Sequence, residues 1–127
     1  MLAAVSAGGV LGALARYGVG LAVAAPRGGF PLATFFVNTS GCLALGLLLV
    51  LVVETWPPAR YVRAFAAVGF VASYTTFSAL VVQAVLLARD GRGGTAAAYV
   101  AATVAAGLLA TAAGIAAGRA LAGRRSP

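Results

Sequence analysis

The chain has 127 residues, of which 62% are hydrophobic and 9% are charged, and its net charge is +7. Soluble domains carry about 25% charged residues, so this composition excludes an ordinary soluble fold and indicates an integral membrane protein. There is no histidine and one cysteine, Cys42, which excludes Ser-His and zinc catalysis, and we expect no enzyme. The basic residues are all arginines beside apolar runs, which favours membrane anchoring over nucleic-acid binding.

Four apolar segments follow one another along the chain. They cover residues 2–25, where Arg16 is the only charge, and residues 32–53, 64–88 and 95–118, which carry no charge. Each is long enough to cross a bilayer as a helix, which takes roughly 20 residues. Short connections containing glycine, proline or arginine separate the segments. The sequence therefore predicts an all-α membrane protein with four transmembrane helices in a single membrane domain, residues 1–127.

The arginines between the spans bear on orientation. Four alternating spans place five arginines on the face that holds both termini, namely Arg60, Arg63, Arg119, Arg124 and Arg125. The opposite face holds three, namely Arg27, Arg89 and Arg92. This small bias favours cytoplasmic termini in the cell inner (plasma) membrane, and its weakness is also compatible with insertion in both orientations.

Small residues recur at helix-contact spacing in three spans, as the pairs Gly8 and Gly12, Cys42 and Gly46, and Gly114 and Gly118. Such pairs let two helices approach closely, either within one chain or between subunits. Four short helices offer too few walls for a monomeric pore. We therefore expect the chain to assemble at least as a dimer.

The third span is polar at its centre, where Ser73, Tyr74, Thr75, Thr76 and Ser78 place five hydroxyl groups within six positions. Hydrocarbon offers such groups no hydrogen-bond partners. Polar groups at this depth usually face a bundle interior or a water-filled path. This segment is therefore the first place to look for function.

Four further polar residues within the spans are candidates for function. Asn38 either joins helices or lines a path, and its predicted helical face also carries Thr34, Gly41, Cys42 and Leu45. Arg16 lies too deep for a simple anchor, so it either snorkels or faces a vestibule. Gln83 shares a predicted helical face with Thr75 and Ala79, and we expect it to form a hydrogen bond between helices. Tyr99, near the start of the fourth span, is expected to be an aromatic residue at the membrane interface.

Three motifs occur in order: G-G-V-L-G-A-L-A-R-Y at residues 8–17, V-N-T-S-G-C-L-A-L-G at 37–46 and G-F-V-A-S-Y-T-T-F-S at 69–78. Together they resemble the fluoride channel family known as Fluc or CrcB. Each motif is weak alone, but three in order across four spans are specific. The resemblance implies a dual-topology dimer with two antiparallel pores and a third helix broken near its middle. It also implies a structural sodium ion at the dimer centre.

The resemblance assigns roles to single residues. It places Asn38, Phe77 and Ser78 on the pore lining, as the pore asparagine, the first pore phenylalanine and the start of a hydroxyl track. Arg16 matches a vestibule arginine. The backbone carbonyls of Ala72 and Thr75 match the sodium ligands, and Tyr99 matches a fourth-helix pore tyrosine. Amide and hydroxyl donors and a phenylalanine ring edge can each face a small anion, which agrees with these roles.

Several positions depart from the family pattern. Leu80 replaces the second pore phenylalanine, Ala79 the next hydroxyl of the track, and Gln83 a glutamate. Ala72 and Ser73 replace paired glycines at the break, which removes backbone freedom there. Leu80 and Gln83 remain expected pore-lining positions, but Leu80 lacks a positive ring edge.

Two interpretations follow from these departures. The chain is either a homodimeric channel that exports cytoplasmic fluoride passively and reduces its toxicity, or one half of a heterodimer with a paralogous subunit. The competing class is a small dual-topology multidrug exporter, which needs a carboxylate within the membrane. The only acids, Glu54 and Asp90, lie in predicted connections. A non-conducting assembly subunit is a further alternative.

Overall fold

The computed structural model describes residues 1–23, 27–55 and 60–123, and the backbone alone for 53–55. The elements in chain order are α1 (Leu2–Ala22), α2 (Leu32–Leu49), η1 (Val50–Thr55), α3 (Arg60–Val62), η2 (Arg63–Val71), α4 (Ala72–Tyr74), α5 (Phe77–Arg89) and α6 (Gly93–Gly123). The elements η1 and η2 are π-helical stretches that continue α2 and α3.

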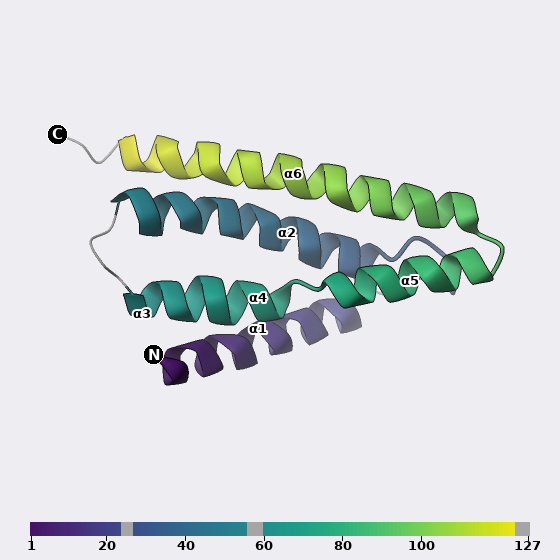
Figure 1. Cartoon of the computed structure of the whole chain (residues 1–127), viewed down its shortest axis with the longest axis horizontal. Helices are drawn as coiled ribbons and strands as arrows, with labels where there is room; N and C mark the ends of the chain where they lie inside the picture. Colours follow the sequence, from purple (N-terminus) through teal and green to yellow (C-terminus); the bar gives the residue numbers. More distant parts are fainter. Residues whose placement is uncertain (24–26, 56–59, 124–127) are drawn as a thin grey trace.

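The described part of the chain contains four helices that are long and apolar enough to cross a membrane: Leu2–Ala22, Leu32–Val52, Arg60–Arg89 and Gly93–Gly123. All four predicted spans are therefore present, although the third begins four residues earlier than expected and the fourth extends five residues beyond the expected end. Figure 1 shows them side by side, with the start of α1 and the end of α6 at the same end of the molecule. Arg124 and Arg125, two of the five arginines expected on the face with both termini, lie outside the described residues.

Glycines allow close packing between two pairs of helices, α1 with η2 and α6 with α2. A Cβ at Gly12 of α1 would lie 3.0 Å from the carbonyl carbon of Phe70 in η2, and one at Gly114 of α6 would lie 2.9 Å from the amide nitrogen of Leu47 in α2. Because these neighbours are backbone atoms, a side chain cannot fit by changing a rotamer. The glycine pairs noted in the sequence thus serve contacts within the chain, and they give no support of their own to a dimer.

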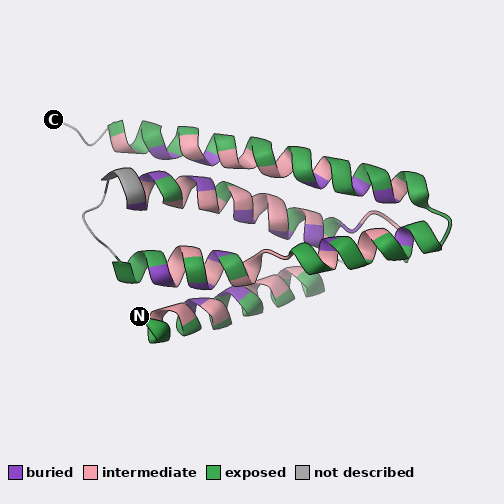
Figure 2. Ribbon diagram, viewed as in Figure 1, coloured by how far each residue is buried: buried purple, intermediate pink, exposed green. Residues whose placement is uncertain are grey.

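Much of the helix ribbon is exposed, as its green stretches in Figure 2 show, and many of the exposed side chains are large and apolar. In α1, for example, only Gly8 and Gly12 are buried, and Leu2 and Leu21 are 83% and 69% exposed. A water-soluble protein of this size would not expose so many large apolar side chains. These faces suit contact with lipid or with another membrane chain.

The third span is broken, as predicted, and the break lies at Thr75 and Thr76. Thr75 has φ −75° and ψ 159°, and Thr76 has φ −150° and ψ 120°, so both are extended. Figure 1 shows this short strand-like link between α4 and α5. Ala72 and Ser73, which replace the family glycines, remain helical within α4. The break therefore divides the span into one half that ends at Tyr74 and another that begins at Phe77.

Candidate functional site

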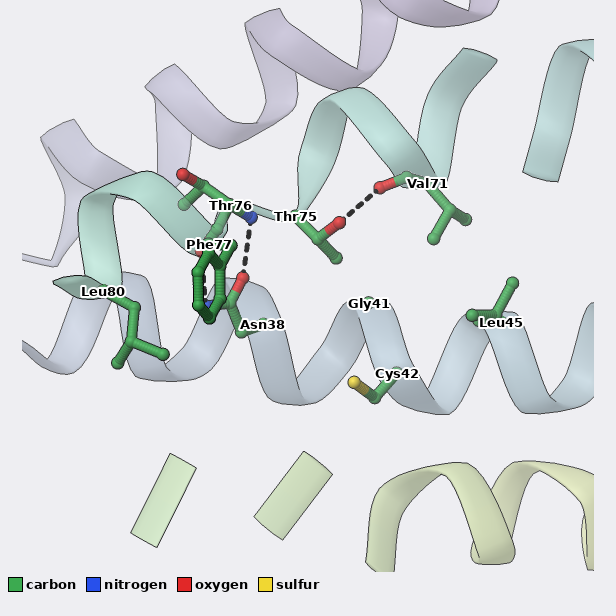
Figure 3. Close-up of a pocket in the computed structure, with 9 residues that line it drawn as sticks. All are labelled: Asn38, Gly41, Cys42, Leu45, Val71, Thr75, Thr76, Phe77 and Leu80. Atoms are coloured by element: carbon green, nitrogen blue, oxygen red, sulfur yellow. Dashed lines mark hydrogen bonds between the residues drawn. The ribbon is translucent and has the colours of Figure 1, made fainter. Parts of the chain in front are cut away.

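Asn38 of α2 lies against the break and bonds both backbone groups of one residue. Its Nδ2 donates to the carbonyl oxygen of Thr76 at 2.9 Å, and its Oδ1 accepts the N–H of Thr76 at 2.8 Å (Figure 3). The two bonds fix the orientation of the amide, because a flipped amide would set oxygen against oxygen and N–H against N–H. One of the two Nδ2 hydrogens remains for another acceptor.

The threonine hydroxyls complete the ends of the two half-helices. Thr76 is the N-cap of α5, since its Oγ1 accepts the N–H of Ala79 at 3.2 Å. Thr75 closes α4 from the other side, because its N–H and its Oγ1 both donate to the carbonyl of Val71 at 3.0 Å. The methyl group of Thr75 occupies the space where Gly41 lacks a side chain. Both threonines are therefore needed to end one helix and begin the next.

Tyr74 adds a second bond between the break and α2. The hydroxyl oxygens of Tyr74 and Ser40 are 2.9 Å apart. Ser40 uses its own hydrogen on the carbonyl of Phe36 at 2.7 Å, so Tyr74 is the donor to Ser40. The Tyr74 ring also stacks on Phe70, with ring centroids 5.9 Å apart.

A polar cavity of about 540 Å³ opens on the α5 side of the break. Its lining residues are Arg16, Gly20, Val23, Ala33, Thr34, Val37, Thr76, Ser78, Ala79 and Gln83. Arg16 is half-buried, and its Nη1 donates to the carbonyl of Thr75 at 3.3 Å. The cavity, which we name the vestibule, therefore combines one positive charge with hydroxyl and amide groups. This placement is compatible with the vestibule interpretation of Arg16, which stays a prediction.

An apolar pocket of about 240 Å³ lies on the other side of Asn38 (Figure 3). Its lining residues are Asn38, Gly41, Cys42, Leu45, Val71, Thr75, Thr76, Phe77 and Leu80. The predicted face of α2 is thus largely assembled here, although Thr34 lines the vestibule instead. Phe77 is 78% exposed, whereas Leu80 is only 7% exposed and packs with Leu87, Ala96 and Tyr99.

Gln83 and Tyr99 form a pair that the sequence did not predict. The Tyr99 hydroxyl donates to Oε1 of Gln83 at 2.8 Å, and the Tyr99 ring is fully buried. Its ring meets Phe30 edge-on, with centroids 5.2 Å apart. The interface-aromatic interpretation of Tyr99 is therefore wrong. Tyr99 itself does not line the vestibule, and it contacts that cavity through Gln83, which does.

The predicted common face of Thr75, Ala79 and Gln83 is also wrong. The chain is extended at Thr75, so that residue does not share the helical register of α5. Thr76, Ala79 and Gln83 line the vestibule together instead. Ser40 was missed among the functional candidates, although it stands two residues after Asn38 in the same N-T-S run.

Two backbone carbonyls at the end of α4 were expected to bind sodium. In a continuous helix, the Ala72 carbonyl would accept the N–H of Thr76, but that N–H donates to Asn38 instead. The Thr75 carbonyl accepts one bond from Arg16 and, like any carbonyl, has a second lone pair. Carbonyl oxygens suit a hard cation. The Ala72 carbonyl is therefore a suitable ligand for sodium, whereas the Thr75 carbonyl already faces the positive charge of Arg16, and sodium binding stays a prediction.

The acidic side chain that the structure describes lies at the far end of α5 from the break. Asp90 caps the end of α5 and is exposed, and the side chain of Glu54 lies outside the described residues. Among the described residues, no three His, Cys, Asp or Glu side chains cluster as a metal site would require. The vestibule in the described part of the chain thus lacks the carboxylate that a proton-coupled exporter needs.

Comparison with known proteins agrees with this architecture. A "fluoride-specific ion channel FluC 3" of Streptomyces avermitilis is 54% identical over 98% of the chain, which spans 61% of that relative's length. A "FluC 2" of Geobacillus kaustophilus is 49% identical over 90% of the chain and 89% of the relative. A "FluC" of Rhodospirillum centenum is 45% identical over 81% of the chain and 82% of the relative. The family model "CrcB-like protein, Camphor Resistance (CrcB)" matches residues 3–115. The chain is a multi-pass membrane protein and belongs to the CrcB-like family.

Proposed function

We propose that this chain is a subunit of a fluoride-selective channel that lets cytoplasmic fluoride leave the cell passively across the plasma membrane. The observation that carries the proposal is the helix break, where the N-terminus of α5, the Asn38 amide and the cationic vestibule converge. The names of three relatives, which share 45–54% identity with the chain, support the same activity.

Attraction of the anion begins at the vestibule. The chain has a net charge of +7, and Arg16 brings one of these charges to the cavity wall. A cleft lined by one sign of charge raises the local concentration of the opposite ion by about 10-fold to 1,000-fold. The bond to the Thr75 carbonyl holds the guanidinium beside the break, so the attraction is directed to the point where the ion must shed water.

Loss of water from fluoride requires replacement donors. The spare hydrogen of Asn38 Nδ2 and the exposed hydroxyl of Ser78 are two such donors. The first N–H groups of α5, at Phe77 and Ser78, lack acceptors within their own helix and lie at its positive end. The Phe77 ring adds an edge of positive partial charge. Asn38 and Phe77 line the apolar pocket and Ser78 lines the vestibule, so an anion that crosses the break meets these replacement groups in turn.

A second chain completes the pore. Phe77 is 78% exposed and Ala72 is exposed in the single chain, although both stand beside the break. A pore wall needs these residues shielded from lipid, and a second subunit packed over them supplies that shield. The partner is either another copy of this chain or a paralogous subunit. The paralogue is favoured by Leu80, which lies in the core of this chain and carries no ring edge.

Sodium is the structural cofactor of this assembly. The carbonyls of Ala72 and Thr75 hold the ion, and the positive charge screens carbonyls at the C-terminal end of α4 from one another. Exchange of sodium for N-methylglucamine should lower the midpoint of thermal unfolding in detergent. An unchanged midpoint in both salts would argue against a bound sodium ion.

Fluoride efflux from liposomes tests the proposed function. Purified chain is reconstituted alone, and the efflux of fluoride and of chloride is recorded with ion-selective electrodes. Fluoride efflux without chloride efflux supports the channel and excludes an obligate heterodimer. Silence of this chain alone, followed by efflux on co-reconstitution with a paralogue from the same organism, supports the heterodimer. Silence in both preparations refutes the channel.

A further inference from the structure

The break in the third span lacks the residues that usually break helices. The residues from Tyr74 to Phe77 include neither glycine nor proline, the two residues that most often interrupt helices. The chain enters the break from α4 and leaves it into the 13-residue α5. Two β-branched threonines lower helix propensity by only a fraction of a kcal/mol, roughly, per residue. The threonine hydroxyls complete the two helix ends, and contacts from other helices are needed in addition to keep this segment extended.

Three side chains from outside the span contact the break. Ser40 accepts from the Tyr74 hydroxyl, and Arg16 donates to the Thr75 carbonyl at 3.3 Å. Only Asn38 bonds both the N–H and the carbonyl of one residue, at 2.8 and 2.9 Å. The N–H is the group that Thr76 would use on the Ala72 carbonyl if the helix continued, so Asn38 replaces that helical partner. The Thr76 carbonyl, as that of the N-cap residue, accepts the first bond of α5, and Asn38 adds a second bond to it.

The substitution has consequences on both sides of Thr76. Toward α4, the Ala72 carbonyl is released from its helical bond, because the N–H of Thr76 points to Asn38. Toward α5, the extended backbone lets the Thr76 hydroxyl cap the helix at the N–H of Ala79. The start of α5 at Phe77 follows from that cap. A single amide on α2 therefore sets the position of both half-helix ends.

We propose that Asn38 is a positioning residue that holds the third span open at Thr76, in addition to any contact it makes with an ion. This inference goes beyond the proposed function, because the reciprocal amide bonds act on the protein backbone whether or not fluoride passes. It makes Asn38 responsible for the extended conformation of Thr76 and for the place where α5 begins.

The test uses the backbone conformation of Thr76 as a readout that is independent of transport. Full-length protein labelled with 13C and 15N at threonine is studied by NMR in lipid nanodiscs, and Thr76 is assigned by its loss in Thr76→Ser. Carbon chemical shifts distinguish extended from helical residues. We expect extended shifts in the unmodified chain, and loss of those shifts toward helical or averaged values in Asn38→Leu.

Thr39→Val is the matched control. Thr39 follows Asn38 on α2, and its buried hydroxyl oxygen has no hydrogen-bond partner in the described structure. Valine has nearly the same shape, so this change removes a polar atom beside Asn38 without removing a hydrogen bond. We expect the Thr76 shifts of this variant to match those of the unmodified chain.

Asn38→Asp separates positioning from ion contact within one folded sample. A protonated carboxyl group can donate to the Thr76 carbonyl and accept its N–H, as the amide does, whereas a carboxylate turns a negative charge toward that carbonyl. We expect extended Thr76 shifts at acid pH that are lost on raising the pH, while the unmodified chain shows no such change. The protonated acid has no spare hydrogen for an anion, so restored conformation need not restore efflux.

The outcomes divide clearly. Loss of the extended shifts in Asn38→Leu, or their pH-dependent return in Asn38→Asp, supports the positioning role. Extended shifts that persist in Asn38→Leu and at every pH in Asn38→Asp overturn it, even if fluoride efflux is abolished, because Asn38 would then act on the ion alone. Absence of efflux in the unmodified chain and its co-reconstituted pair would refute the channel while leaving the conformational test valid.

Discussion

Replacement of Gly12 by alanine should separate α1 from η2 and thereby disturb the break. The added Cβ would lie 3.0 and 3.1 Å from the carbonyl carbon and Cα of Phe70, and closer still to the Phe70 oxygen. Ordinary contacts between carbon atoms lie at about 3.5–4.0 Å, so the two backbones must move apart by roughly 0.5 Å. Phe70 lies two residues before the start of α4, and Arg16 follows Gly12 by one helical turn. The displacement should therefore also weaken the bond from Arg16 to Thr75.

The expected magnitude follows from a comparison on the same helix. A Cβ at Gly18 or at Gly20 would meet no heavy atom within 4 Å. Alanine at these two positions should gain about 0.5–1 kcal/mol of helix propensity. Gly12→Ala gains the same propensity but adds an overpacking cost of about 1–3 kcal/mol. The difference between the variants isolates the steric cost, and we expect Gly12→Ala to be less stable than Gly18→Ala by about 1–3 kcal/mol.

The assay is equilibrium unfolding in mixed micelles with increasing SDS, followed by far-ultraviolet circular dichroism. Gly20→Ala serves as a second control against an unseen contact at Gly18. Equal unfolding free energies for Gly12→Ala and both controls would show that α1 and η2 do not pack as closely as the structure places them. Fluoride efflux should fall in Gly12→Ala and stay unchanged in Gly18→Ala, whereas Gly20 lines the vestibule and Gly20→Ala is compared for stability alone.

Three further predictions concern the vestibule and the core beside it. Arg16→Gln should lower fluoride efflux about tenfold or more, because it removes the charge from the vestibule. Arg16→Lys keeps a charge and should show an efflux rate between those of the unmodified chain and Arg16→Gln. Equal rates for the unmodified chain and both variants would show that Arg16 does not act on the ion. Tyr99→Phe removes only the hydroxyl that donates to Gln83 at 2.8 Å, so the free energy of unfolding in the SDS titration should fall by about 0.6–1.7 kcal/mol. No change would mean that Gln83 finds another partner. Leu80→Phe should cost about 1–3 kcal/mol in the same titration, because Leu80 is 7% exposed among Leu87, Ala96 and Tyr99; an unchanged or higher stability would show that the site has room for the ring.

The four spans could be predicted from the sequence because length and hydrophobicity decide them locally. The break could be placed only approximately. Its polar composition was visible, but the residues that hold it, Asn38 and Arg16, are 38 and 59 positions away in the chain from the groups they bond. The pairing of Gln83 with Tyr99 was hidden for the same reason, since it depends on how α5 and α6 pack. Tertiary hydrogen bonds of this kind leave no periodic signal in one sequence.

The five hydroxyls of the third span illustrate what the structure adds. They first indicated a polar path, yet three of them are occupied by protein groups: Tyr74 bonds Ser40, Thr75 bonds the Val71 carbonyl, and Thr76 caps α5. Ser78 differs, because its one bond is a long contact of 3.4 Å with Thr76 and its side chain is exposed on the vestibule. Most of the polarity is therefore needed to interrupt a helix inside a membrane without glycine. Ser78 is the hydroxyl at this break best placed to exchange its partner for an ion.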